Sequence, residues 1–156
     1  MSAVAAVATA LGVAEASVRE LRPGELTLEV ESKALPGLAD RVSGSLLGRL
    51  VTLFVTDERS SIDRFVLHHV WSLPKERTFV HLVAPVDPSN PVFPSIAAKY
   101  PAANWFEREI MDFFGLRPEG HPNLARVALH DDWPDGAWPL RKDFPDDRLV
   151  PRLTGD

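Results

Sequence analysis

The stretch WFEREIMDFFGLRPEGHP, from Trp105 to Pro122, carries the most informative pattern in the chain. Pro101 suits the first turn of a helix and Gly115 suits the position that ends one, so we expect a helix over roughly residues 102–114. Successive side chains turn by about 100° around such a helix. One stripe of the helix then carries the residues that face the core, which are Ala103, Phe106, Ile110, Phe113 and Phe114.

The opposite side of this helix is mostly polar and consists of Asn104, Trp105, Arg108, Glu109 and Asp112. Arg108 and Asp112 are four residues apart, a spacing that allows an ion pair. Glu107 lies near the apolar edge and needs a buried partner if it stays ionised. A charged helix face is usually only solvated surface, but the large apolar Trp105 on this side favours contact with a partner.

Length and composition limit the class of protein. A chain of 156 residues corresponds to one compact domain. The net charge of −5 and the lack of a basic stripe argue against a nucleic-acid partner. The absence of cysteine excludes disulfides, thiolate-bound zinc and a conventional iron–sulfur cluster held by this chain alone. The apolar run that begins at Ala3 is too short to cross a bilayer, so we expect neither a signal peptide nor a membrane anchor.

The first half of the chain predicts helices and a hairpin. The Ala-rich run after Ser2 indicates a helix that ends at Gly12. A hairpin is expected at Pro23 and Gly24, where two segments with strand-like patterns meet. Apolar residues at helical spacing indicate a further helix over residues 35–46.

Three strand-like runs follow, RLVTLFVT from Arg49, IDRFVLHHVWSL from Ile62 and RTFVHLVAPV from Arg77. Short turn segments separate them, so we expect an antiparallel meander. The fold class predicted is α+β, a two-layer domain with a mostly antiparallel or mixed sheet, helices packed on one face and an extended C-terminal tail. We assign residues 1–122 to this domain and residues 123–156 to its docking tail.

Three segments in the second half resemble one known family. NWFEREIMDFFGL, EGHPNLARV and PLRKDFP follow one another between residues 104 and 145, and they resemble the 30-kilodalton subunit family of respiratory complex I. The strands upstream follow the same layout, so the resemblance covers nearly the whole chain. It implies a cofactor-free, hydrophilic subunit that packs against a large subunit related to nickel–iron hydrogenases and organises an oxidoreductase without catalysing its reaction.

Departures from the complex I pattern favour a particular branch. Complex I members commonly read GHPDLRR, whereas Ala125 stands here in place of one arginine. They also commonly carry a second GHP before LRKDFP, where this chain has Ala137, Trp138 and Pro139. The spelling LHDDWPDGAWPLRKDF is more similar to the related domain of energy-converting group 4 nickel–iron hydrogenases and formate hydrogenlyase-type complexes. We favour that class, with the 30-kilodalton-type subunit of NADH-quinone oxidoreductase, complex I proper, as the alternative.

The resemblance also implies partners and a location. The partners expected are the hydrogenase-like large subunit and the small iron–sulfur subunit of the same complex. A nickel–iron centre and iron–sulfur clusters are expected in those subunits, and no cofactor in this chain. Contact with the membrane is expected only through partner subunits, at the cytoplasmic face.

Candidate docking residues combine this resemblance with side-chain chemistry. Guanidinium groups bind carboxylates in pairs of hydrogen bonds, and tryptophan is enriched at interface hot spots. Pro139 and Pro145 favour an extended segment that either lies along a neighbour or is fastened to its own domain by Leu140 and Phe144. The full set is Trp105, Glu107, Arg108, Glu109, Asp112, His121, Arg126, Trp138, Arg141, Lys142 and Asp143.

Two other classes of function remain open. An independent acid–base or metal enzyme would draw on carboxylates of the helix together with His121 and His130. However, Glu107 and Glu109 diverge by about 200° on a helix, and no HEXXH, GxGxxG or P-loop motif occurs. A free-standing adaptor fits the composition but leaves the three-part resemblance unexplained.

Overall fold

The computed structural model describes residues 2–145 and contains helices, strands and two short 3₁₀ turns. The helices are α1 (Ala3–Leu11), α2 (Leu35–Ser45), α3 (Arg59–Ile62) and α4 (Ala103–Phe114), and the 3₁₀ turns are η1 (Glu15–Ser17) and η2 (Ser32–Ala34). The strands are β1 (Arg19–Arg22), β2 (Glu25–Glu29), β3 (Arg49–Asp57), β4 (Phe65–Leu73), β5 (Thr78–Val86), β6 (Val92–Pro94) and β7 (Arg117–Glu119). No helix among the described residues is long and apolar enough to span a bilayer.

The main sheet has five strands in the order β1-β2-β5-β4-β3. The antiparallel meander β3–β4–β5 and the hairpin β1–β2 confirm the expectations from sequence. Strand β2 pairs with β5 in parallel, which makes the sheet mixed. The short parallel pair β6–β7 was not expected, and it joins the segments on either side of α4. The predicted α+β fold class is therefore confirmed.

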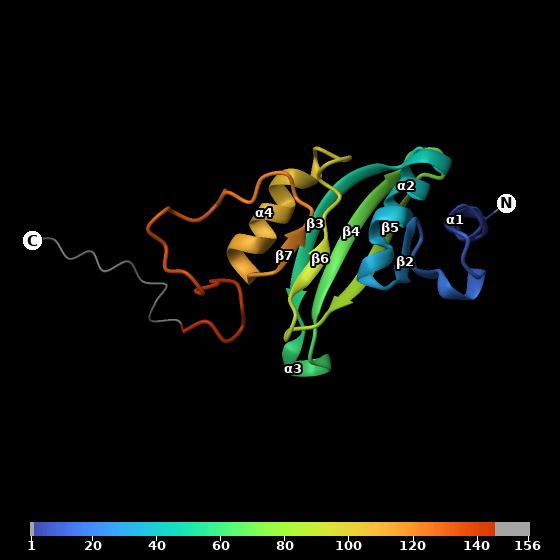
Figure 1. The fold of residues 1–156 in the computed structure, drawn as a ribbon. Helices are drawn as coiled ribbons and strands as arrows, with labels where there is room; N and C mark the ends of the chain where they lie inside the picture. The colour runs from blue at the N-terminus through green and yellow to red at the C-terminus, as the bar shows by residue number, and fades with distance from the viewer. Residues whose placement is uncertain (1, 146–156) are drawn as a thin grey trace, which may run out of the picture.

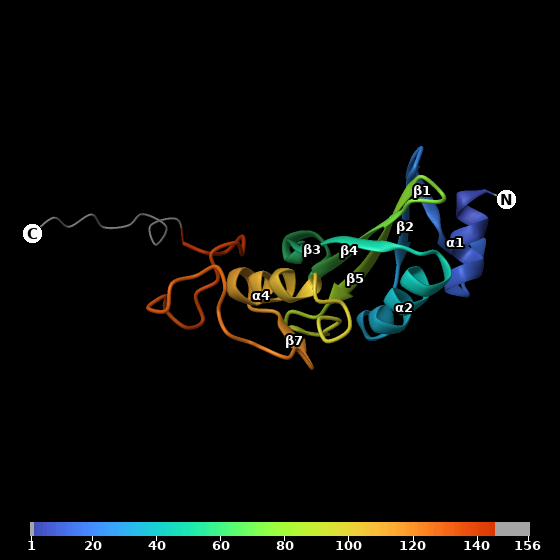
Figure 2. The ribbon, with the colours of Figure 1, turned by 90° about the horizontal axis from the view of Figure 1, so that it is seen from above.

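One face of this sheet carries the hydrophobic core. Alternate residues of β4 point to this face, among them Phe65, Leu67 and Trp71, and they are fully buried. Helices α2 and α4 both lie on this side of the sheet, as the two views show (Figures 1 and 2). The expectation that the helices pack on one face therefore holds.

Helix α4 follows the predicted bounds closely and ends at Gly115. This glycine has a left-handed backbone with φ of 71°, and its N–H donates to the carbonyl of Met111. A Cβ atom at this position would lie 2.2 Å from Cε2 of Trp138, so only glycine fits. The predicted apolar stripe is confirmed, with Ala103 and Ile110 buried and its three phenylalanines half-buried.

The C-terminal tail lacks helices and strands between residues 120 and 145 and runs beside α4 (Figure 1). Its PLRKDFP segment is folded locally into turns instead of an extended strand. The Arg141 N–H donates to the Trp138 carbonyl at 3.2 Å, and the Phe144 N–H donates to the Arg141 carbonyl at 3.0 Å. These turns bring the side chains of Arg141 and Asp143 back onto the domain.

His69 is a polar residue inside the core. Its side chain is 0% exposed, and its strand neighbours are Leu53 and Leu82. Neither ring nitrogen has a hydrogen-bond partner among the described residues. Burial lowers the pKa of His69 to about 3, because the charged imidazolium cannot be solvated there. The adjacent His68 points to the other face of the sheet, where its ring stacks on Phe54 with 4.5 Å between the ring centres.

We expect His69→Leu to stabilise the fold, and more strongly in acid. The unfolded chain takes up a proton on this residue below pH about 6.5, whereas the folded chain resists it until pH about 3. Stability is therefore lost as the pH falls through this window, by about 2 kcal/mol at pH 5. The leucine variant escapes that loss, and urea unfolding at pH 7.5 and pH 5 measures it. An equal change in unfolding free energy at both pH values would contradict the assignment.

Candidate docking site on helix α4 and the C-terminal tail

Asp112 holds the tail against α4. Its side chain is 5% exposed, and its Oδ2 accepts the N–H groups of Val127 and Ala128, both at 2.9 Å, and of Leu129 at 3.3 Å. A carboxylate that accepts several backbone N–H groups is well satisfied without an ion-pair partner. The ion pair with Arg108 that the spacing allows does not form, because the tail occupies this carboxylate.

Arg108 also binds the tail. Its Nε donates to the Ala125 carbonyl at 2.6 Å, and its Nη2 donates to the Arg126 carbonyl at 2.9 Å. Its guanidinium lies 5.5 Å from the centre of the Trp105 ring, within the range of a cation–π contact. Arg108 therefore links the exposed tryptophan to the main chain of the tail.

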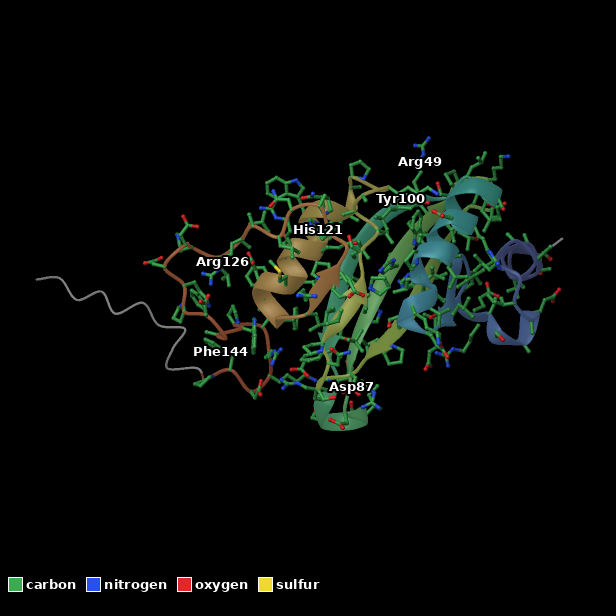
Figure 3. All side chains as sticks on the ribbon, in the orientation of Figure 1. Arg49, Asp87, Tyr100, His121, Arg126 and Phe144 are labelled. Atoms are coloured by element: carbon green, nitrogen blue, oxygen red, sulfur yellow. The ribbon has the colours of Figure 1, made fainter. Side chains whose placement is uncertain are left out.

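Arg126 stabilises the loop that follows it. Its Nη1 donates to the carbonyls of His130 at 3.1 Å and Trp133 at 2.7 Å, and its Nη2 contacts Asp135 at 2.6 Å. The indole N–H of Trp133 donates to the Ala137 carbonyl at 2.8 Å. This loop is thus held by side chains and not by a regular backbone ladder. Figure 3 shows Arg126 on the tail beside α4.

Arg141 joins the tail to the C-terminal end of α4. Its Nε donates to the Phe114 carbonyl at 2.7 Å, one of the carbonyls that a helix leaves free at its C-terminus. The guanidinium lies 3.8 Å from the ring centre of Trp138 and 5.0 Å from that of Phe65. Burial lowers the pKa of Arg141 from its ordinary value.

A further link joins the tail to the end of β3, far away in the sequence. Arg59 contacts both Asp57, at 2.7 Å, and Asp143, at 2.6 Å. The N–H of Lys142 donates to Asp57 Oδ2 at 2.9 Å. Hydrogen bonds from Arg59 hold the pKa of Asp57 well below its usual range. The tail is therefore fastened to its own domain by these polar contacts, while Leu140 stays exposed.

Glu107 lies on the buried side of α4 and joins three segments of the chain. Its side chain is 0% exposed and accepts hydrogen bonds from the Ser95 hydroxyl and, at 2.8 Å, from the Ile96 N–H. His121 Nε2 lies 3.9 Å from its carboxylate. Burial raises the pKa of Glu107, and these hydrogen bonds oppose that shift. The buried partner that the sequence required is therefore present.

His121 sits in the GHP turn with its side chain inside the protein. Its Nδ1 accepts the N–H of Asn123 at 3.0 Å, so Nε2 is the protonated nitrogen of the neutral ring. That Nε2–H faces the Asn104 carbonyl at 3.3 Å as well as Glu107. The turn is thereby fixed against the first turn of α4, which is visible beside the label for His121 in Figure 3.

The predicted docking residues fall into three groups by exposure. Those on the surface are Trp105, Glu109, Lys142 and Asp143, and Trp105 is 62% exposed. The half-buried ones are Arg108, Arg126, Trp138 and Arg141, and the buried ones are Glu107, Asp112 and His121. The two last groups bind within the chain, and the docking role of all of them stays a prediction. Asp57, Arg59 and Asp135 were missed, because their partners are distant or lie in irregular segments.

The helix carboxylates that an independent enzyme would draw on are not gathered in one site. Glu107 is buried while Glu109 is exposed, so the two do not share a site, as their spacing predicted. In residues 2–145 no group of three or more histidine, aspartate or glutamate side chains is placed to hold a metal ion. The ordered polar contacts of this region hold the tail in place.

Comparison with known proteins gives the family. Residues 28–148 match the family described as "Respiratory-chain NADH dehydrogenase, 30 Kd subunit". The matched range includes β3, β4 and β5, the whole of α4 and residues 123–145 of the tail. The chain belongs to this family of complex I 30-kilodalton-type subunits.

Two curated relatives represent its branches. The chain is 38% identical over 133 residues to formate hydrogenlyase subunit 5 of Escherichia coli (strain K12), covering 85% of this chain and 23% of the relative. It is 36% identical over 126 residues to an NADH-quinone oxidoreductase subunit of Salinispora tropica, covering 78% of this chain and 51% of the relative. The chain thus spans about a quarter of the first and about half of the second.

A solved structure has the same fold. A chain from the membrane-bound sulfane sulfur reductase, an archaeal respiratory membrane complex, superposes with a TM-score of 0.74 at 21% identity. The superposition covers 89% of this chain and 86% of the other. At this level of identity the likeness concerns the fold alone.

Asp112→Ala is expected to release the tail from α4. Three backbone N–H groups lose their acceptor, and a lost buried hydrogen-bond partner costs about 1–3 kcal/mol. Together the lost hydrogen bonds should lower the free energy of local opening by at least about 1.4 kcal/mol, which corresponds to a factor of ten. Hydrogen exchange of the amides of Val127, Ala128 and Leu129 should therefore accelerate at least tenfold.

Two variants make this test specific. Glu109→Ala changes an exposed carboxylate on the same helix and should leave those three amides unaffected. Asp112→Asn keeps one acceptor oxygen and should restore part of the protection. Unchanged exchange in Asp112→Ala would show that the tail is held by its other contacts alone.

Proposed function

We propose that this chain is a cofactor-free docking subunit of a membrane-associated, complex I-like oxidoreductase. It binds the hydrogenase-like large subunit, next to the small iron–sulfur subunit, at the cytoplasmic face of the membrane. The observation that carries this proposal is the large exposed Trp105 on a helix whose polar neighbours are fixed by the tail. Large apolar side chains on a rigid surface are typical of interface hot spots.

Among complexes of this type, we propose an energy-converting group 4 nickel–iron hydrogenase. Support comes from the identity to formate hydrogenlyase subunit 5, which is the relative with the wider coverage of this chain. Further support comes from Trp138, which stands where complex I members commonly have a histidine and which packs on Gly115 here. The nickel–iron centre and the iron–sulfur clusters then belong to partner subunits. The corresponding subunit of NADH-quinone oxidoreductase is the alternative.

The buried candidates contribute to docking from the inside. Glu107, Asp112 and His121 hold the tail, the GHP turn and α4 in fixed relative positions. A surface that is rigid before binding loses less conformational entropy when a partner covers it. Their side chains therefore prepare the surface, while Trp105 and Glu109 form part of it.

Purification of the tagged chain from gently solubilised membranes of its native cells tests this function. A hydrogenase-type large subunit in the eluate, together with nickel and hydrogen turnover, would support the hydrogenase assignment. The same large subunit with quinone reductase activity and without nickel would select NADH-quinone oxidoreductase. A chain that elutes alone under mild conditions would contradict the docking role and revive the adaptor interpretation.

Trp105→Ala is expected to weaken assembly without unfolding the chain. The side chain is largely exposed, so its loss should change the unfolding free energy by no more than about 0.5 kcal/mol. An interface tryptophan contributes about 2 kcal/mol or more to binding, so recovery of the large subunit should fall at least tenfold. Phe79→Ala is the matched control, since Phe79 is an exposed aromatic on the sheet face away from α4. Equal recovery from both variants would place the interface elsewhere.

A further inference from the structure

The guanidinium groups on the docking surface are already engaged. We define the α4–tail surface as the outer side of Ala103–Phe114 together with residues 123–145. On it Arg108 and Arg126 bind mainly main-chain carbonyls, and Arg141 binds the end of α4 between two aromatic rings. These cations hold the tail, so they are not free to receive the carboxylates of a partner.

The charges that remain exposed are mostly negative. Five carboxylate residues of the α4–tail surface are exposed and only one cationic residue, Lys142; the carboxylates are Glu109, Asp131, Asp132, Asp135 and Asp143. Asp135 and Asp143 are paired with Arg126 and Arg59. Within residues 2–145 the other three form no ion pair. The surface therefore presents negative charge that is not paired within residues 2–145.

The α4–tail surface also carries large apolar side chains. Trp105, Leu124 and Leu140 are all exposed and come from the start of α4, the turn after His121 and the tail. Helix and tail are joined by Asp112 and Arg108, so these residues belong to one rigid unit. Asp131 and Asp132 lie two and three residues beyond Leu129, the last residue that Asp112 binds. Apolar anchors with charged surroundings are the usual composition of a specific interface.

We infer that the α4–tail surface binds a basic face of its partner, one that carries lysine and arginine side chains opposite Glu109, Asp131 and Asp132. This inference rests on the proposed docking function and specifies its partner. Complementary charges increase the rate of association and prevent the wrong register, whereas an acidic partner face would be repelled. From the sequence, Arg108, Arg126 and Arg141 indicated a partner face that carries carboxylates. These arginines bind within the chain, so the inferred partner face has the opposite charge.

Charge reversal tests the inference in the assembled complex. The tagged full-length chain and its Asp131→Lys, Asp132→Lys double variant are purified from solubilised membranes at 50, 150 and 500 mM NaCl, and the bound large subunit is quantified. We expect the double variant to retain at most one fifth of the large subunit at 150 mM. The unaltered chain should lose the large subunit progressively as the salt concentration rises, because salt screens the attraction between exposed charges. At 150 mM this screening acts beyond about 8 Å.

A matched control separates local from overall charge. Glu15→Lys, Glu20→Lys changes two exposed carboxylates near the other edge of the sheet and alters the net charge equally. It should retain the large subunit as the unaltered chain does, and thermal unfolding should show that both double variants are folded. Equal retention by both double variants overturns the basic-partner inference and leaves the docking function standing. Absence of the large subunit from unaltered chain overturns both.

Discussion

The carboxylate of Glu107 is the constraint on which the second half of the fold depends. It lies fully inside the protein on α4 and receives donors from the segment before the helix, while the imidazole after the helix faces it. A buried carboxylate is costly unless several donors surround it. The three segments must therefore stay together for the group to remain satisfied, and this requirement sets the position of α4 relative to β6 and the GHP turn.

A similar requirement explains why the tail can keep a fixed course without strands or helices. Main-chain groups in irregular segments need partners other than a regular ladder. Here Asp112 supplies an acceptor for three successive N–H groups, and arginines supply donors for carbonyls. Guanidinium groups suit this task because each presents several donors in a rigid plane. The contacts of Arg108, Arg126 and Arg141 with main-chain carbonyls are thus a consequence of the tail's irregular backbone.

Local pattern alone predicted the meander, the bounds of α4, its apolar stripe and the need for a buried partner at Glu107. It failed for Asp112, because a helix projection separates polar from apolar sides and cannot show that the tail covers part of the polar side. The contact between Arg59 and Asp143 was beyond reach, since the two are 84 residues apart and each looks like ordinary surface charge. The parallel pairing of β2 with β5 depends on the path of the whole chain. In the candidate site, residue types were identified well, but the direction in which each arginine points was not.

The contact between Gly115 and Trp138 has an evolutionary consequence. The indole occupies the space that any side chain at position 115 would need, and the left-handed backbone independently disfavours one there. Where a relative carries a smaller ring at the position of Trp138, the steric part of this restriction is relaxed and only the backbone part remains. The two positions should therefore covary across the family, with glycine most strictly kept in the sequences that have tryptophan. Such a pattern would mark the branch in which the tail is seated directly on the end of α4.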